Sequence, residues 1–127
     1  QEEQRHLRAL ALFGGLTEVE ALLGEVHDGT VRTQDAPFLL RSLLAHRHHR
    51  AVAWRSVTDH WEDLTGRLPS NSIARMLEGV RALVGAGIDP EVDRFLDDHP
   101  VPQGALMVAQ HRERRGVNLR LRTRLLG

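Results

Sequence analysis

The residues with the clearest capacity for chemistry are three closely spaced histidines, His46, His48 and His49. Imidazoles at such spacing can bind zinc or nickel. The stretch contains two arginines, Arg47 and Arg50, and no carboxylate that could orient the rings. A zinc hydrolase would also need a pattern such as His-Glu-x-x-His, and no histidine here precedes a glutamate. We therefore expect a solvated loop at this stretch, no metal ligand in this chain and no catalytic residue.

Paired carboxylates are the next candidates, because acid–base chemistry needs two titratable groups that face one site. Glu62 and Asp63 are adjacent, so they point to different sides of a helix. Asp97 and Asp98 precede His99 at the predicted end of a helix. We expect all of these side chains to be solvated.

The strongest electrostatic feature is a run of arginines, because residues 112–124 contain six arginines and one glutamate. Such a cluster could attract a peptide carboxylate, a phosphate backbone or an acidic protein surface. We favour the simpler interpretation of a solvated face on a terminal helix, where arginine also suits the helix dipole. No aromatic residue is interleaved, which argues against single-stranded nucleic acid. The six are Arg112, Arg114, Arg115, Arg120, Arg122 and Arg124.

The composition fits one domain of 127 residues with an ordinary core, because 41% of the residues are hydrophobic. Cysteine is absent, which excludes disulfides, thiolate metal sites and thiol nucleophiles. The formal net charge is zero, which argues against a general nucleic-acid binder. No apolar run approaches the ~20 residues of a membrane helix, and no signal peptide is visible. We expect a soluble, cytoplasmic domain, cut from the C-terminal part of a longer chain that supplies the initiator methionine.

Helical periodicity runs along the whole chain. A first helix ends at Gly14-Gly15, and a second begins at a capping box of Thr17 and Glu20 and ends at Asp28-Gly29. A connector over residues 31–37 leads to a third helix, for which Asp35 is the predicted cap and Pro37 lies in the first turn.

The later helices follow the same spacing. Trp54 and Trp61 lie on one apolar stripe of a helix that runs to Gly66, and we expect both in the core. Ser70 or Ser72 caps a helix over residues 70–84, and Gly85 stops it. Further helices are expected from the Asp89-Pro90 start signal and from near Pro102, with an apolar stripe at the end of the last one. The stripe consists of Val117, Leu121 and Leu125.

No segment shows the period-two alternation of a strand. The expected fold is all-α and forms a single domain over residues 1–127. Its antiparallel pairs lie near 1–28, 36–66 and 70–98, and a long terminal helix follows. The pairs are predicted to stack as a short HEAT/armadillo-like α-solenoid.

Four segments of the chain, in this order and spacing, resemble one known domain. The domain is the C-terminal helical domain of the gluzincin zinc aminopeptidases, the family of aminopeptidase N and the puromycin-sensitive and endoplasmic-reticulum aminopeptidases. The most specific parts are the Thr-Gln-Asp-x-Pro connector and the two tryptophans seven residues apart. The chain departs from the family at Leu121, where tryptophan is common, and before Ser70, where the loop is shorter. The segments are 31–38, 51–64, 70–76 and 113–120.

The resemblance implies a parent enzyme that removes N-terminal residues from peptides, with its zinc in an upstream catalytic domain and no cofactor in this fragment. The C-terminal domain of such enzymes curves over the catalytic domain and walls a substrate chamber. Gln34, Asp35 and Phe38 are then expected to contact peptide substrate near a chamber-facing turn, with the loop 69–71 nearby. From the residues alone, Asp35 is equally a helix cap and Phe38 a core contact.

Two other functions compete with this one. A free-standing helical-repeat module could bind a partner protein or an extended peptide on a concave face, without enzyme activity. A nucleic-acid accessory domain could use the arginine face near the C-terminus. The sequence favours the aminopeptidase domain, whose partners would be the upstream catalytic domain and a peptide, and neither nucleic acid nor a membrane.

Overall fold

The computed structural model describes residues 9, 14–85 and 88–126 of the chain, and these residues contain helices and no strand. The predicted all-α class is therefore confirmed for this part of the chain. The helix expected before Gly14 lies outside the described residues, except for Ala9. The elements are α2 (Leu16–Asp28), α3 (Ala36–Ala45), α4 (Arg50–Asp59), α5 (Trp61–Arg67), α6 (Ser70–Met76), the 3-10 helix η1 (Leu77–Ala82), α7 (Asp89–Asp98) and α8 (Ala105–Leu126).

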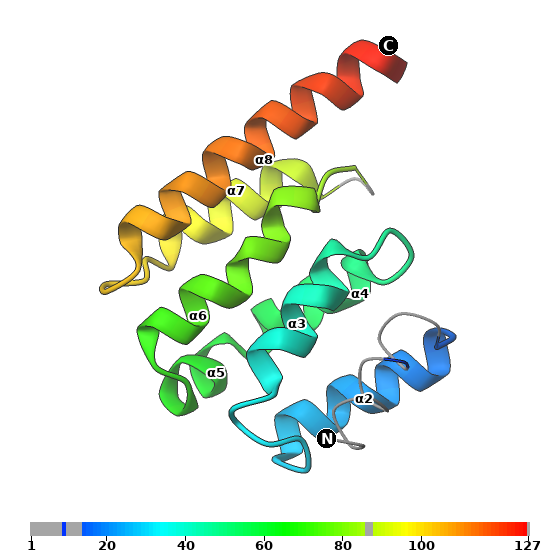
Figure 1. Ribbon diagram of the computed structural model, residues 1–127, viewed down its shortest axis with the longest axis vertical. Coiled ribbons are helices and arrows are strands. Elements are labelled where there is room, and N and C mark those ends of the chain that lie inside the picture. Colours follow the sequence, from blue (N-terminus) through cyan, green and yellow to red (C-terminus); the bar gives the residue numbers. More distant parts are fainter. Residues whose placement is uncertain (1–8, 10–13, 86–87, 127) are drawn as a thin grey trace.

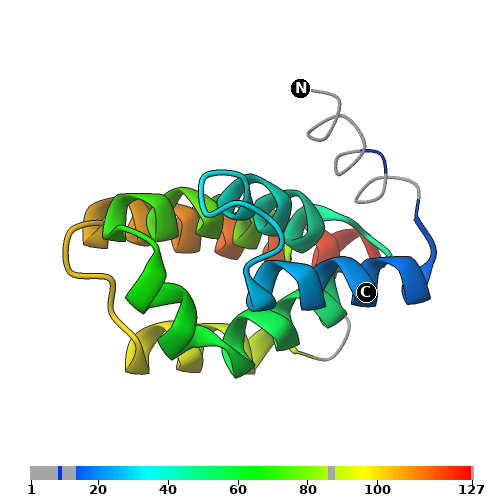
Figure 2. The same cartoon turned by 90° about the horizontal axis from the view of Figure 1, so that it is seen from below.

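The helices form two layers (Figures 1 and 2). One layer contains α3, α6 with η1, and α8, and the other contains α4 with α5, and α7. Helix α2 closes one end of the stack beside α3 and α4. Consecutive elements thus alternate between the layers, as paired helices do, while the HEAT/armadillo-like solenoid itself stays a prediction.

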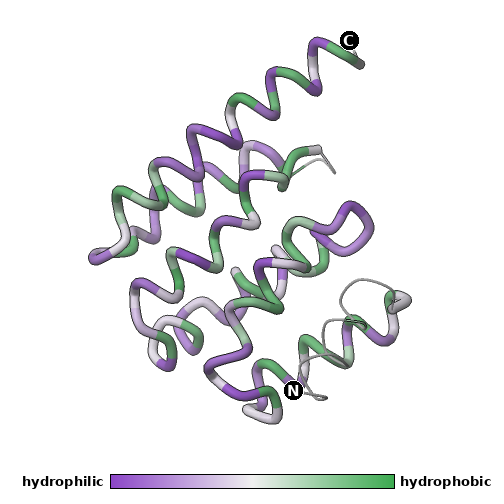
Figure 3. The backbone as a smooth tube through the Cα atoms, viewed as in Figure 1, coloured by the Kyte–Doolittle hydropathy of each residue, from purple (hydrophilic) through white to green (hydrophobic). Residues whose placement is uncertain are grey.

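The core between the layers is mainly aliphatic, and hydrophobic segments recur along every helix (Figure 3). The central element is η1, which contacts α3 on one side and α8 on the other. A glycine permits this close approach, because a Cβ on Gly79 would lie 2.5 Å from the carbonyl oxygen of Arg41 and 2.7 Å from the Cβ of Leu44. The close approach of α3 and η1, which lie side by side in the same layer, therefore occurs where η1 has no side chain.

The two tryptophans lie in the core, as predicted. Trp54 is 4% exposed and Trp61 is 8% exposed. Both rings meet Phe95 of α7 edge-on, at centroid distances of 5.4 and 5.2 Å. The prediction of one continuous helix was wrong, because α4 ends at Asp59 and α5 begins at Trp61. At the break, the backbone of His60 leaves helical angles and its ring donates to the carbonyl oxygen of Ser56.

The predicted helix starts were close but mostly misassigned. Helix α2 begins at Leu16, where the carboxylate of Glu18 accepts the Gly15 N–H, so Thr17 and Glu20 do not form the capping box. Helix α6 already includes Ser70, and its N-cap is Pro69 instead of a serine.

The predicted starts of α3 and α7 are also only partly correct. Asp35 occupies the N-cap position of α3, as predicted, but its side chain makes no capping hydrogen bond, and Pro37 lies in the first turn. Asp89 is the first residue of α7 and not its cap. Its carboxylate instead accepts the backbone N–H of Gly85 at 2.9 Å.

The helix predicted over residues 70–84 changes type after Met76 and continues as η1. Gly85 then has a φ of 88°, a left-handed conformation that favours glycine, so the predicted stop at this residue is confirmed. The predicted apolar stripe at the end of α8 is wrong, because Leu121 is 46% and Leu125 81% exposed. None of the described helices combines the length and apolarity that crossing a membrane requires.

Candidate functional site

A pocket of about 430 Å³ lies between the start of α3 and the turn from α5 to α6. We call it the α3–α6 pocket. Two of the three residues expected to contact substrate, Gln34 and Phe38, line it together with Pro69. The full lining is Thr33, Gln34, Pro37, Phe38, Arg41, Leu68, Pro69, Ser72, Arg75 and Met76.

The chemistry of this pocket is cationic and aromatic. Phe38 is 54% exposed, so its ring is available at the surface, and the guanidinium of Arg41 lies 5.4 Å from the ring centroid. Arg41 also forms an ion pair with Glu78 at 3.2 Å. Arg75 lines the pocket from α6. Such a lining can hold an apolar side chain beside a carboxylate.

The structure separates the three predicted contact residues. Gln34 and Phe38 share the pocket, whereas Asp35 is 8% exposed at the N-cap of α3 and is not part of the lining. The alternative of Phe38 as a core contact was wrong, because the side chain is exposed. The stretch 69–71 lies near the pocket through Pro69, but its last two residues already belong to the first turn of α6.

The two arginines of the pocket were missed in the sequence. A usable signal exists, because Phe38 and Arg41 are three residues apart on α3 and therefore share a helix face, as do Ser72 and Arg75 on α6. Only the packing of α3 against α6 brings the two faces together. That contact is not visible in the spacing of either helix.

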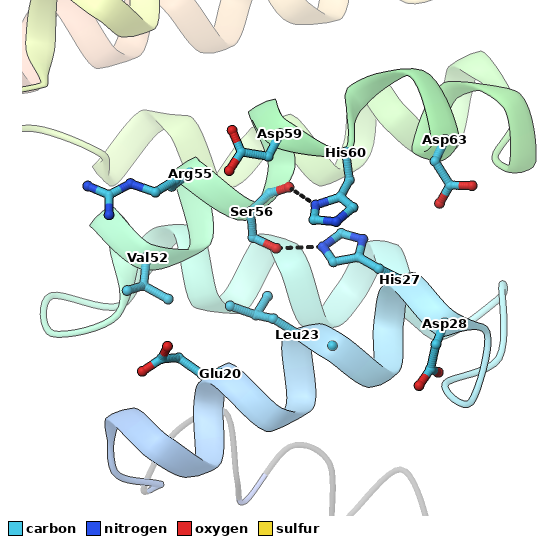
Figure 4. Close-up of a pocket in the computed structure, with 11 residues that line it drawn as sticks. Glu20, Leu23, His27, Asp28, Val52, Arg55, Ser56, Asp59, His60 and Asp63 are labelled. Atoms are coloured by element: carbon cyan, nitrogen blue, oxygen red, sulfur yellow. Dashed lines mark hydrogen bonds between the residues drawn. The ribbon is translucent and has the colours of Figure 1, made fainter.

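A second pocket, of about 630 Å³, lies between α2 and α4–α5 (Figure 4). We call it the α2–α4 pocket. The rings of His27 and His60 stack inside it, 3.6 Å apart and nearly parallel. Ser56 contacts both, because its hydroxyl group is hydrogen-bonded to His27 Nε2 and its carbonyl oxygen accepts from His60 Nδ1. Four carboxylates also line this pocket: Glu20, Asp28, Asp59 and Asp63.

Burial is the main cause that lowers the pKa of His27 from 6.5 to about 4, and the nearby His60 and Arg67 add to it. Asp63 acts in the opposite direction. A serine bonded to a neutral histidine is the start of a catalytic triad, but the third group would have to orient the other ring nitrogen. His27 Nδ1 is buried and has no hydrogen-bond partner among the described residues. The pair therefore lacks the orienting carboxylate of a nucleophilic site.

The solvated loop expected near residue 48 is confirmed for Arg47 and His48, which are exposed, and is wrong for His49. His49 is 5% exposed at the N-cap of α4, and its ring stacks on His46 at 4.2 Å. Burial lowers the pKa of His49, and His46 and His48 lower it further. Within the described ranges, no three His, Asp or Glu side chains are placed to hold a metal ion.

The arginine cluster is divided between the interior and the surface. Arg115 is 1% exposed and forms ion pairs with Asp89 at 2.8 Å and Asp93 at 3.4 Å. Arg112 pairs with Asp97 at 2.8 Å. The expectation of a solvated face was therefore wrong for Arg115, because the arginines of α8 meet the acidic residues of α7. The exposed members are Arg114, Arg120, Arg122 and Arg124.

Comparison with known proteins gives one family and one relative. The relative is "Aminopeptidase 2, mitochondrial" of Saccharomyces cerevisiae, which is 34% identical over 68 residues, or 54% of this chain and 7% of the yeast protein. The chain thus matches only a small part of that protein, and the cytoplasmic location expected above stays a prediction.

No solved structure matches the chain. The model of the ERAP1-like C-terminal domain matches residues 1–115, which is most of the chain and includes both pockets. The resemblance to the C-terminal helical domain of aminopeptidases is thereby confirmed. The chain belongs to the family of ERAP1-like C-terminal domains.

Proposed function

We propose that this chain is the non-catalytic C-terminal domain of a zinc aminopeptidase, in which it walls the substrate chamber and binds the distal part of the peptide. Family membership and the match to a yeast aminopeptidase support the parent activity. The zinc and the bond-breaking residues would lie in an upstream catalytic domain.

The observation that carries the peptide-binding role is the lining of the α3–α6 pocket. It joins an exposed aromatic ring, Phe38, to the guanidinium groups of Arg41 and Arg75 and to the amide side chain of Gln34. The ring would pack on an apolar side chain, the arginines would hold a carboxylate, and the amide would bond to peptide backbone. These are the contacts that a peptide segment far from the scissile bond can make.

The test uses the complete parent enzyme with two substrates, a peptide long enough to reach this domain and a single amino acid bearing a chromogenic amide. Phe38→Ala and Arg75→Ala should each lower kcat/KM for the long peptide by about tenfold, the effect of losing ~1.4 kcal/mol of binding. The short substrate should be cleaved at the wild-type rate. Arg114→Ala, at an exposed position on α8, serves as the matched control.

Equal losses on both substrates would contradict the proposal, because they would indicate a general defect in the enzyme. Unchanged cleavage of the long peptide in both variants would contradict it as well. A parent sequence with no His-Glu-x-x-His motif upstream would remove the catalytic half of the proposal. A partner-binding helical module without enzyme activity would then remain.

A further inference from the structure

Both ends of α2 lie beside a stacked pair of histidines. At its C-terminal end, His27 stacks on His60, and we call these two the C-terminal histidine pair. At its N-terminal end, His49 forms a backbone hydrogen bond with Gly14, just before α2, and stacks on His46. We call His46 and His49 the N-terminal histidine pair. The two pairs lie at opposite ends of α4, so α2 is attached to both ends of that helix.

The hydrogen bonds of the C-terminal histidine pair suit a neutral His27. His27 Nε2 is hydrogen-bonded to the hydroxyl group of Ser56, and His60 Nδ1 donates to the carbonyl oxygen of the same residue (Figure 4). The remaining nitrogen of His27, Nδ1, is buried with no partner among the described residues. A second proton on His27 would therefore be placed at a buried atom that has no acceptor.

The N-terminal histidine pair has the same property. His46 Nδ1 accepts the backbone N–H of His48 at 3.1 Å, so a proton on this nitrogen would break that bond. His49 Nδ1 is buried and has no partner in the described part of the chain. Protonation of either ring thus costs a hydrogen bond or creates a buried donor without an acceptor.

We propose that His27 and His49, each stacked in its histidine pair, form a pH-sensitive attachment of α2, which holds α2 on α4 when these two rings are neutral and releases it when they are protonated. Helix α2 packs chiefly on α4, whereas the central element η1 contacts both α3 and α8. Separation would uncover its apolar face, which consists of Val19, Leu22, Leu23 and Val26.

The charged groups around the C-terminal histidine pair oppose a second proton on balance. From α5, the carboxylate of Asp63 would favour the proton, but it already pairs with Arg67 at 3.0 Å. Arg67 also donates to the carbonyl oxygen of Val26, which brings its positive charge to the end of α2. The other charged side chains around this pocket are Glu20 and Asp28 of α2, and Arg55 and Asp59 of α4.

The turn that contains the N-terminal histidine pair, residues 46–50, consists of histidines and arginines. His46 and His48 face His49 from the same turn, and each lowers its pKa. Arg47 and Arg50 belong to this turn, and Arg50 donates to the carbonyl oxygen of Ala82 in η1. The stretch 46–50 contains no carboxylate. A proton gained on His49 therefore adds charge of like sign to this turn, and only the hydrogen bond with the Gly14 backbone acts in the opposite direction among the causes that shift its pKa.

The direction of the pH effect follows from the neutral, bonded state. Burial lowers the pKa of His27 from 6.5 to about 4 and also lowers the pKa of His49. When α2 is released, the rings of His27 and His49 bind protons more readily than in the attached state. The attachment is therefore complete above pH 6.5 and is lost as the pH falls toward 4.

The test is hydrogen exchange of the 127-residue chain at pH 7 and pH 5, expressed as protection factors so that the intrinsic pH dependence of exchange cancels. Protection in α2 should fall by up to about 20-fold from His27 alone, because each pKa unit is a tenfold change in proton affinity. In the double variant His27→Gln and His49→Gln, this loss should be abolished. His99→Gln, which removes a stacked histidine outside α2, should leave it unchanged.

The protection factors of α6 and α8 are expected to fall at low pH in every variant. His111 lies on α8, is hydrogen-bonded to Ala74 of α6, and also has a lowered pKa. Equal loss in α2 of the wild type and the double variant would overturn the proposal. If the double variant does not fold, an NMR titration of wild-type His27 decides the question. The expected apparent pKa of His27 is near 4, and the amide chemical shifts of α2 should change over the same pH range. Titration of His27 near 6.5 without changes in the α2 amides would overturn the proposal.

Discussion

The N-terminal region (α2 to α5) and the C-terminal region (α6 to α8) bury different kinds of side chain. In the N-terminal region the contacts between helices are made by aliphatic residues, tryptophans and stacked imidazoles. In the C-terminal region Arg115 is 1% and His111 3% exposed, and both lie on the inner face of α8. The arginine makes ion pairs with α7, and the histidine is bonded to Arg81 and to the backbone of Ala74.

This difference shows that a run of charge in a sequence does not locate a binding surface. The richest cluster of arginines contributes its most buried member to the internal ion pairs of the C-terminal region. The cations that line the α3–α6 pocket, the proposed peptide site, are instead Arg41 and Arg75, which lie far apart in the sequence. Burial and neighbours, and not the local density of charge, separate the two roles.

Arg115→Ala is the strongest test of the charged interior. It would leave Asp89 and the carbonyl oxygen of Leu83 without their guanidinium partner. Removing one partner of a buried ion pair is strongly destabilising, and Asp93 is half exposed, so we expect a loss of about 3 kcal/mol. Urea unfolding followed by circular dichroism measures this loss, and Arg114→Ala should change stability by less than about 0.5 kcal/mol. Similar results for both variants would show that the buried ion pair does not stabilise the fold.

Gly79→Ala tests the contact that joins the two regions. The new methyl group would clash with the backbone of Arg41 and the side chain of Leu44 on α3, so we expect a loss of about 2 kcal/mol. Gly66→Ala is the matched control, because that glycine is helical and exposed and no atom lies within 4 Å of its Cβ position. The control should gain up to about 1 kcal/mol. Thermal unfolding separates the two, and a neutral Gly79→Ala would mean that η1 and α3 can move apart at little cost.

The two regions also differ in how much the sequence predicts. Spacing of three and four residues locates the helices of the N-terminal region and its buried tryptophans, because apolar burial leaves a periodic pattern. The same rule fails on α8, where the inward positions include His111 and Arg115 and the apolar Leu121 and Leu125 are exposed. A pattern based on hydrophobicity cannot identify a buried arginine whose partners lie on another helix.

The candidate site was predictable only in part, for a related reason. The connector before α3 leads to Gln34 and Phe38, both of which line the α3–α6 pocket. Asp35, their neighbour, is buried at the N-cap of α3 and does not line the pocket. Arg75 joins the pocket through packing of α6 against α3, a tertiary contact with no local signal.

His111→Gln tests whether the charged interior of the C-terminal region depends on a neutral imidazole. Burial is the largest cause that lowers the pKa of His111, so the folded state resists its second proton. Stability from this residue is therefore complete above pH 6.5 and decreases as the pH falls. The free energy of unfolding of the variant should be lower by about 1 kcal/mol at pH 7, because one hydrogen bond is lost. Below pH 6.5 its stability should depend less on pH than that of the wild type. Urea unfolding midpoints from pH 7.5 to 5 measure both effects. If the slope of stability against pH is the same in the variant and the wild type, the loss of stability in acid is due to other groups.

The smallest expected effect belongs to the exposed ion pair between the regions, Arg41 of α3 and Glu78 of η1. Their side chains are 39% and 47% exposed, so solvent screens the 3.2 Å contact. A double-mutant cycle with Arg41→Gln and Glu78→Gln should give a coupling energy of about 0.5 kcal/mol or less that vanishes in high salt. A coupling energy above about 1 kcal/mol would mean that the two regions are joined by surface charge as well as by the close approach at Gly79. The contrast between an apolar N-terminal region and a charged C-terminal interior would then no longer describe how the regions are held together.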